Sequence, residues 1–158
     1  MAIKYLSNSQ CLHVCGPPGI GKTSFVKILG HYLHLREMYK DGVYYLDLKP
    51  AQNITKVNEM MQEIGVDLQP TMTGQKNMLL ILDNCDNLLK KSAASVMILL
   101  KFFNKECGVS VVFTSIVEIL DSEYTFERLS LEHLSPQEAA GLLIFNTRPL
   151  TKSELGTQ

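Results

Sequence analysis

Short apolar runs alternate with longer amphipathic segments along most of the chain. Four runs are almost entirely apolar or β-favouring and are predicted as strands, over residues 11–15, 42–48, 78–82 and 109–113. Between them apolar residues recur at helical spacing, which predicts helices over 22–35, 53–64 and 91–104. A run that is apolar throughout is typical of a strand buried on both faces of a parallel sheet.

The last third of the chain carries weaker signals. A fifth, short strand is expected over 126–131, and Pro70 and Gly74 mark 69–75 as a loop. Ser135 and Glu138 form a capping box, which predicts a helix from 135 to about 145, followed by a frayed polar tail.

The alternation of strands and helices predicts an α/β fold. We expect a three-layer α/β/α sandwich with a mostly parallel five-stranded sheet, in which the 11–15 strand is central. The 158 residues fit a single domain, with a core of about residues 8–145.

Composition narrows the class of protein. The formal net charge is -1 and only three arginines are present, at positions 36, 128 and 148. Without a basic field, we expect no nucleic-acid contact by this domain. The four cysteines have no zinc spacing and are expected to be buried thiols in a reducing compartment. No signal peptide or apolar stretch of about 20 residues is present, so we expect a cytoplasmic protein without membrane contact.

Residues 16–23 read GPPGIGKT and fit the phosphate-loop pattern G-x-x-x-x-G-K-[ST], the Walker A motif. The motif follows a predicted strand and opens a predicted helix, which is the context that the chemistry needs. Its glycines allow the backbone to turn N–H groups toward an anion, and the helix adds its positive end. The expected nucleotide contacts are Gly16, Gly19, Ile20, Gly21, Lys22, Thr23 and Ser24.

Within this set three side chains have distinct expected roles. Lys22 is expected to reach the β- and γ-phosphates, Thr23 to ligate Mg²⁺, and Ser24 to touch the α-phosphate. The alternative is a structural turn rich in glycine and proline.

Asp83 follows the apolar run LLIL and is predicted to lie at the carboxyl end of a buried strand. Ligands bind at that edge of parallel sheets, so Asp83 is the expected second Mg²⁺ contact, directly or through water. Many P-loop ATPases carry a further acid directly after it, but here the residue is Asn84. Asp86 is the nearest substitute, although the residues favour a turn or helix-cap role for it. Lys22, Asp83 and Asp86 are therefore the candidate catalytic residues, and slow hydrolysis is expected.

Thr114 and Ser115 end the next buried run, VVF. Hydroxyls at this edge either sense a γ-phosphate or cap the segment that follows, and the residues alone leave both possibilities open.

The order of the segments GPPGIGKTS, YYLDL, LLILDNCDNLL, VSVVFTS and LSLEHLSPQEAAGLL resembles the nucleotide-binding domain of the STAND class of P-loop ATPases, which includes the NB-ARC family. The resemblance covers about residues 8–145, and LDNCDNLL is most similar to the bacterial regulator branch. It implies adenine nucleotide, ATP or ADP with Mg²⁺, as ligand. It also implies that Asp83 is the Walker B acid, that Thr114 and Ser115 lie in the sensor motif, and that nucleotide exchange switches assembly with other domains or protomers.

Two departures from the family pattern bear on function. The sensor motif usually ends in arginine, where this chain has Ile116. The downstream Gly-x-Pro and winged-helix segments, which would cover the adenine, are absent from this sequence. We therefore expect either a fragment of a larger switch protein or a reduced homologue.

Three other functions compete with the switch module. A small P-loop kinase would need more arginines to clamp the transferred phosphate. A degenerate protein-interaction module would not need an intact Lys22, Thr23 and Asp83. A ring-forming motor ATPase is disfavoured by Asn84 and by the shortage of candidate arginine fingers.

Overall fold

The computed structural model describes residues 2–66, 68, 76–119 and 126–146, and its centre is one parallel sheet. The strands are β1 (Cys11–Cys15), β2 (Val43–Asp47), β3 (Leu79–Asp83), β4 (Ser110–Ser115) and β5 (Glu127–Ser130). They lie in the order β2-β3-β4-β1-β5, and every neighbouring pair is parallel. The predicted α/β fold with a five-stranded parallel sheet is confirmed.

The expected central position of the phosphate-loop strand needs correction. β4 is the middle strand, and β1 lies between β4 and β5. The apolar pattern could not decide this, because β1, β3 and β4 are buried along their whole length. Their order depends on crossovers that composition does not record.

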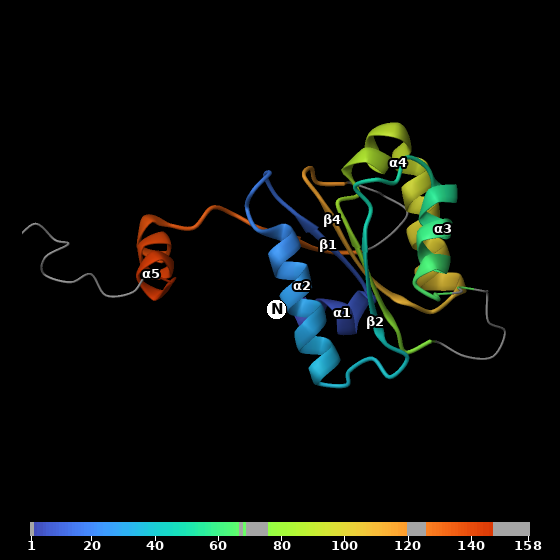
Figure 1. The fold of residues 1–158 in the computed structure, drawn as a ribbon, viewed down its shortest axis with the longest axis horizontal. Coiled ribbons are helices and arrows are strands. Elements are labelled where there is room, and N and C mark those ends of the chain that lie inside the picture. The colour runs from blue at the N-terminus through green and yellow to red at the C-terminus, as the bar shows by residue number, and fades with distance from the viewer. Residues whose placement is uncertain (1, 67, 69–75, 120–125, 147–158) are drawn as a thin grey trace, which may run out of the picture.

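Helices cover both faces of the sheet and complete the three layers (Figure 1). The covering helices are α1 (Ala2–Ser9), α2 (Lys22–Leu35), α3 (Ile54–Glu63), α4 (Asp86–Lys101) and the short π-helix η1 (Phe102–Glu106). A further helix, α5 (Pro136–Asn146), follows β5. α1 and α2 contribute to one apolar core with Leu12, Val14 and Ile81. α3 and α4 contribute to the other with Leu80, Leu82 and Val111 on the opposite face.

Two helices depart from the sequence-based expectation. α1 was not predicted, because its eight residues include a polar end. α4 begins at Asp86 rather than 91, and Ser92 interrupts it with an extended backbone (φ -162°, ψ 96°). The Ser92 hydroxyl accepts the Ser95 N–H (3.2 Å) and caps the second part of the helix. The apolar pattern therefore indicated only that second part.

The C-terminal capping box forms as expected. The Ser135 N–H donates to the Glu138 carboxylate (2.8 Å), and the Glu138 N–H donates to the Ser135 hydroxyl (3.2 Å). These bonds lower the pKa of Glu138. Figure 1 shows α5, in orange-red, standing apart from the sheet. The expected loop over 69–75 and the polar tail lie outside the described residues. Among the described helices, none has the length and hydropathy of a membrane span.

Candidate functional site

The polar residues singled out in the sequence gather at the carboxyl edge of the sheet. The loop after β1 carries the glycines, α2 begins at Lys22, β3 ends at Asp83, and β4 ends at Ser115. The strand register places Cys15 beside Ser115, and Asp83 beside Asp47 of β2. Segments far apart in sequence therefore meet at one edge.

The loop conformation requires glycine at three positions. Gly16, Gly19 and Gly21 have φ angles of 148°, 77° and 103°. A Cβ atom at Gly16 would lie 2.6 Å from the carbonyl oxygen of Leu131, so the residue is fixed by both backbone angle and space. A Cβ at Gly19 or Gly21 would meet no heavy atom within 4 Å, since both residues border open space.

Lys22 folds back over the loop and is only 9% exposed. Its Nζ atom donates to the carbonyl oxygens of Gly16 (2.7 Å) and Pro17 (3.0 Å). No side chain caps α2, whose preceding residue Gly21 is left-handed, and the Phe25 N–H donates to the Gly21 carbonyl (2.8 Å). The N–H groups of the first helical turn are therefore available for an anion.

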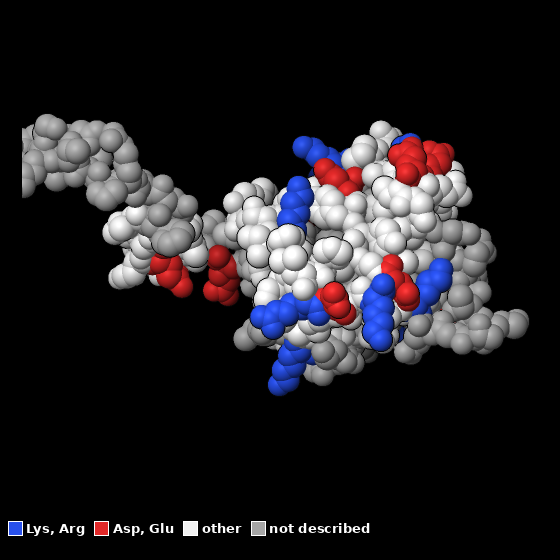
Figure 2. Space-filling model, turned by 60° about the horizontal axis from the view of Figure 1, so that its bottom comes forward, with Lys and Arg blue, Asp and Glu red and all other residues white. Residues whose placement is uncertain are grey.

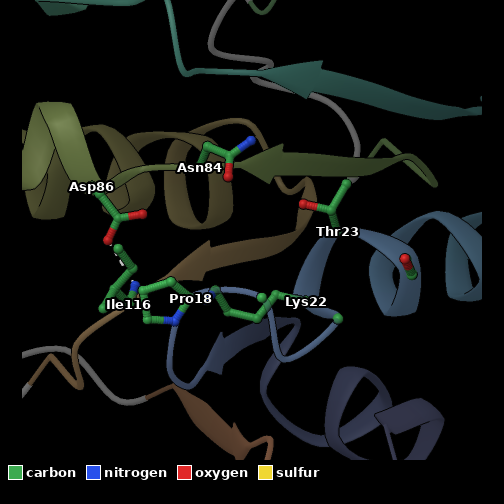
Figure 3. Close-up of a pocket in the computed structure, with 9 residues that line it drawn as sticks. Pro18, Lys22, Thr23, Asn84, Asp86 and Ile116 are labelled. Carbon is green, nitrogen blue, oxygen red and sulfur yellow. Dashed lines mark hydrogen bonds between the residues drawn. The ribbon is translucent and has the colours of Figure 1, made fainter.

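A cavity of about 370 Å³ opens in front of this helix end (Figure 3). It is lined by Pro18, Gly19, Gly21, Lys22, Thr23, Ser24, Asn84, Asp86 and Ile116. The structure thus brings the end of β3, the start of α4 and the segment after β4 to the phosphate loop. Ile20 does not line this cavity; its N–H donates to the Pro17 carbonyl (3.4 Å) within the loop.

Asp83 is not among the residues that line this cavity and is fully buried. Its Oδ1 atom accepts the Thr114 hydroxyl at 2.6 Å, and its Oδ2 atom accepts the Tyr45 hydroxyl at 2.8 Å. Two hydroxyl donors thus satisfy part of the hydrogen-bonding capacity of a buried carboxylate, which lowers the cost of keeping it out of water.

Asn84 stands directly after Asp83, where many P-loop ATPases have a second acid. Its backbone is left-handed (φ 61°). Its N–H donates to the Thr114 hydroxyl (2.9 Å), and its side-chain amide donates to Asp47 Oδ1 (2.8 Å). Asp47 was not selected from the sequence, although its position at the end of a predicted strand was a usable signal. The neighbouring acid at this edge therefore comes from β2, not from the residue after Asp83.

Asp86 is the first residue of α4 and lines the cavity. Its Oδ1 atom accepts the Ile116 N–H at 2.7 Å, drawn as a dashed line in Figure 3. One oxygen of this carboxylate therefore holds the segment after β4 against α4.

Thr114 and Ser115 point to different partners. Thr114 bonds to Asp83 as described, whereas the Ser115 hydroxyl donates to the Val117 carbonyl and lies 2.7 Å from His13 Nε2. His13 stacks on Phe113, with ring centroids 4.5 Å apart. Burial, and secondarily the charge of Arg128, lower the pKa of His13 to about 4. Ser115 therefore ties the segment after β4 to the strand that precedes the phosphate loop.

The residues present are chemically suited to Mg²⁺ and a polyphosphate. Thr23 and Asp83 offer hard oxygen ligands, and the helix end, the glycine backbone and Lys22 offer positive groups. No group of three acidic, histidine or cysteine side chains with metal-binding geometry occurs among the described residues. A bound phosphate would therefore have to supply further oxygens.

A comparison of the sequence with known families decides the class of protein. The profile of the "ATPase family associated with various cellular activities (AAA)" matches residues 12–134, which include the phosphate loop and both acidic strand ends. The chain belongs to the AAA family of ATPases.

This AAA domain is also similar to a curated protein and to solved structures. A Mycobacterium tuberculosis protein described as an HTH-type transcriptional regulator is 31% identical over 105 residues, which cover 60% of this chain and 12% of that protein. Drosophila ORC bound to DNA superposes with a TM-score of 0.65 (15% identity; 90% of this chain, 44% of that one). Aeropyrum pernix ORC1 in complex with DNA gives 0.66 (17% identity; 91% and 46%). The chain spans about an eighth of the regulator and under half of the two ORC chains.

These structural neighbours contradict the prediction that a domain of this kind contacts no nucleic acid, because both proteins of the same fold were solved with DNA. The prediction rested on a near-neutral charge and few arginines. Net charge averages over the whole surface, whereas DNA binding requires only a local positive patch or a neighbouring domain. On the face that Figure 2 shows, lysines and arginines lie scattered among acidic residues.

Proposed function

We propose that this AAA domain binds ATP or ADP with Mg²⁺ and acts as the nucleotide switch of a regulatory ATPase of the STAND or NB-ARC type. The carrying observation is the cavity at the start of α2, where Lys22, Thr23 and Ser24 face Asn84 and Asp86. The motif order along the chain and the HTH-type regulator among its relatives support the regulatory class.

The residues of this cavity have complementary roles in the proposal. The loop N–H groups and Lys22 bind the phosphates. To reach them, the Lys22 ammonium gives up its hydrogen bonds to the carbonyl oxygens of Gly16 and Pro17. Thr23 and Asp83 hold Mg²⁺, which neutralises phosphate charge when it is bound. The Thr114 hydroxyl links the end of β4 to Asp83 by a hydrogen bond. A shift of Asp83 on nucleotide binding would therefore move the segment that begins at Ile116.

Hydrolysis is proposed to be slow because the cavity is poor in catalytic groups. Asn84 cannot take a proton at neutral pH, and its amide is engaged with Asp47. Asp86 has one oxygen committed to the Ile116 N–H. Ile116 supplies no charge at the position where the STAND sensor usually ends in arginine.

Calorimetric titration of ATP, ADP and GTP with Mg²⁺ tests the proposal in the 158-residue chain and in Lys22→Ala. Hydrogen bonds to charged groups contribute about 1.5–3 kcal/mol, so the variant should bind adenine nucleotides at least about tenfold more weakly. Lys40→Ala is the matched control. It removes the same charge from the turn before β2, at the opposite edge of the sheet, and should leave the affinity unchanged.

Each contrary result counts against a specific part of the proposal. Equal affinity in the parent and Lys22→Ala would refute the assigned phosphate site. Preference for GTP would refute the adenine assignment. Rapid multiple turnover would contradict a switch, and transfer of phosphate to a small molecule would favour the kinase alternative.

A further inference from the structure

Tyr45 is the least expected partner of the proposed magnesium site. Its hydroxyl donates to Asp83 Oδ2 at 2.8 Å, although the residues are 38 positions apart. Tyr45 lies on β2, the edge strand, directly beside Ile81 of β3. The side chain thus extends along the sheet toward the carboxyl end, where Asp83 lies.

The other face of Tyr45 contacts the helix that carries the phosphate-binding residues. Lys27 Nζ lies over the Tyr45 ring, 4.9 Å from its centroid. Lys27 and Thr23 are four residues apart in α2 and therefore share one side of that helix. Tyr45 thus bridges the acidic end of β3 and the side of α2 on which Thr23 lies.

The bond to Asp83 has a defined direction. The phenolic O–H of Tyr45 is the donor, and Oδ2 of Asp83 is the acceptor. Thr114 occupies the other oxygen, so the two hydroxyls fix the rotation of the Asp83 side chain from opposite sides.

We propose that Tyr45 is a positioning residue for Mg²⁺ binding: together with Thr114 it holds the Asp83 carboxylate in the orientation that faces the metal of a bound nucleotide. Each carboxylate oxygen has about two acceptor positions. Oδ1 accepts only the Thr114 hydroxyl among the described residues and so has a position for the metal or its water, whereas Oδ2 also accepts the Asn84 side-chain amide at 3.5 Å. Partners of this kind typically affect metal affinity by about 10–100-fold. The inference rests on the proposed function, because it assumes that Asp83 contacts Mg²⁺.

The test compares Tyr45→Phe with Tyr44→Phe in the full chain. Tyr45→Phe removes the donor but keeps the ring beneath Lys27. Tyr44→Phe removes the same atom from the preceding residue, whose side chain packs against the core on the opposite face of the sheet. ADP binding is measured with Mg²⁺ and with a chelator, which yields the factor by which Mg²⁺ strengthens ADP binding.

We expect this factor to fall about tenfold in Tyr45→Phe, the lower end of the range above, while chelated ADP binds as in the parent. Tyr44→Phe should change neither value. An unchanged factor in Tyr45→Phe would overturn the inference, and so would an equal loss with and without Mg²⁺, because that pattern indicates general structural damage.

Failure of the underlying function has a different signature. If the parent binds ADP and Mg²⁺ strengthens ADP binding equally in the parent and in Asp83→Asn, Asp83 is not the metal contact. That result would also refute the inference about Tyr45. If the parent binds no adenine nucleotide at all, the proposed function itself is refuted. A Mg²⁺ factor that falls in Asp83→Asn and Tyr45→Phe alike supports both.

Discussion

Replacing Thr114 with valine should destabilise the domain far more than the loss of one hydroxyl usually does. Valine keeps the shape of the side chain, so the effect isolates two hydrogen bonds. Thr114 is fully buried, and its hydroxyl donates to Asp83 Oδ1 at 2.6 Å and accepts the Asn84 N–H at 2.9 Å. The substitution therefore removes a donor from a buried carboxylate and an acceptor from a backbone N–H group.

The expected loss follows from these two contacts. A hydrogen bond to a charged group contributes about 1.5–3 kcal/mol and a neutral one about 1 kcal/mol, so the free energy of unfolding should fall by about 3 kcal/mol. For a domain of this size that corresponds to a decrease of about 6–12 °C in the melting temperature. The chain contains no tryptophan, so urea unfolding followed by far-UV circular dichroism is the suitable assay.

Two further variants complete this experiment. Thr55→Val makes the same chemical change at an exposed position of α3 and should stay within about 0.5 kcal/mol of the parent. In an Asp83→Asn background the cost of Thr114→Val should drop by at least about 1 kcal/mol, because the lost bond is then neutral. A loss below about 1 kcal/mol in the parent, or an equal cost in both backgrounds, would refute the argument from the buried carboxylate.

Two other predictions follow from the same edge of the sheet. The pKa of His13 is about 4 in the folded chain and about 6.5 when unfolded, so below pH 6.5 the unfolded state binds the extra proton and stability falls. Between pH 7 and 4.5 the free energy of unfolding should fall by about 2.5 kcal/mol, which a series of urea titrations should detect. His13→Gln should largely abolish this fall. Parallel pH profiles for the parent and the variant would contradict the prediction. The double variant Asp47→Asn, Asn84→Asp exchanges the two side chains. It keeps the amide–carboxylate pair but places the carboxylate at position 84, which lines the cavity. Phosphate release from ATP should rise at least about tenfold with ADP affinity unchanged, and an unaltered rate would mean that the lack of an acid at position 84 does not limit hydrolysis.

Local sequence patterns were sufficient wherever the relevant interaction is short-range. The phosphate loop is encoded within residues 16–23, because its glycines, lysine and threonine act through the backbone turn that they themselves form. The Ser135 and Glu138 capping box was equally readable, since both partners lie within one helical turn. The apolar run before Asp83 was enough to place that acid at the end of a buried strand.

Tertiary structure alone decided which side chains meet at that edge. β1, β3 and β4 are all fully buried and similarly apolar, so nothing in their composition ranks them, and their order emerges only from the crossovers between them. That order brings Tyr45 of β2 to Asp83 across 38 residues, and Asp47 of β2 to Asn84 across 37 residues. Consecutive residues of a strand point to opposite faces of the sheet, so the hydroxyls of Thr114 and Ser115 lie on different faces. Because β4 lies between β3 and β1, Thr114 bonds to Asp83 of β3 and Ser115 lies beside His13 of β1. The sequence alone therefore determined the phosphate loop and the acid, whereas the partners that orient the acid depend on strand order, which no local pattern encodes.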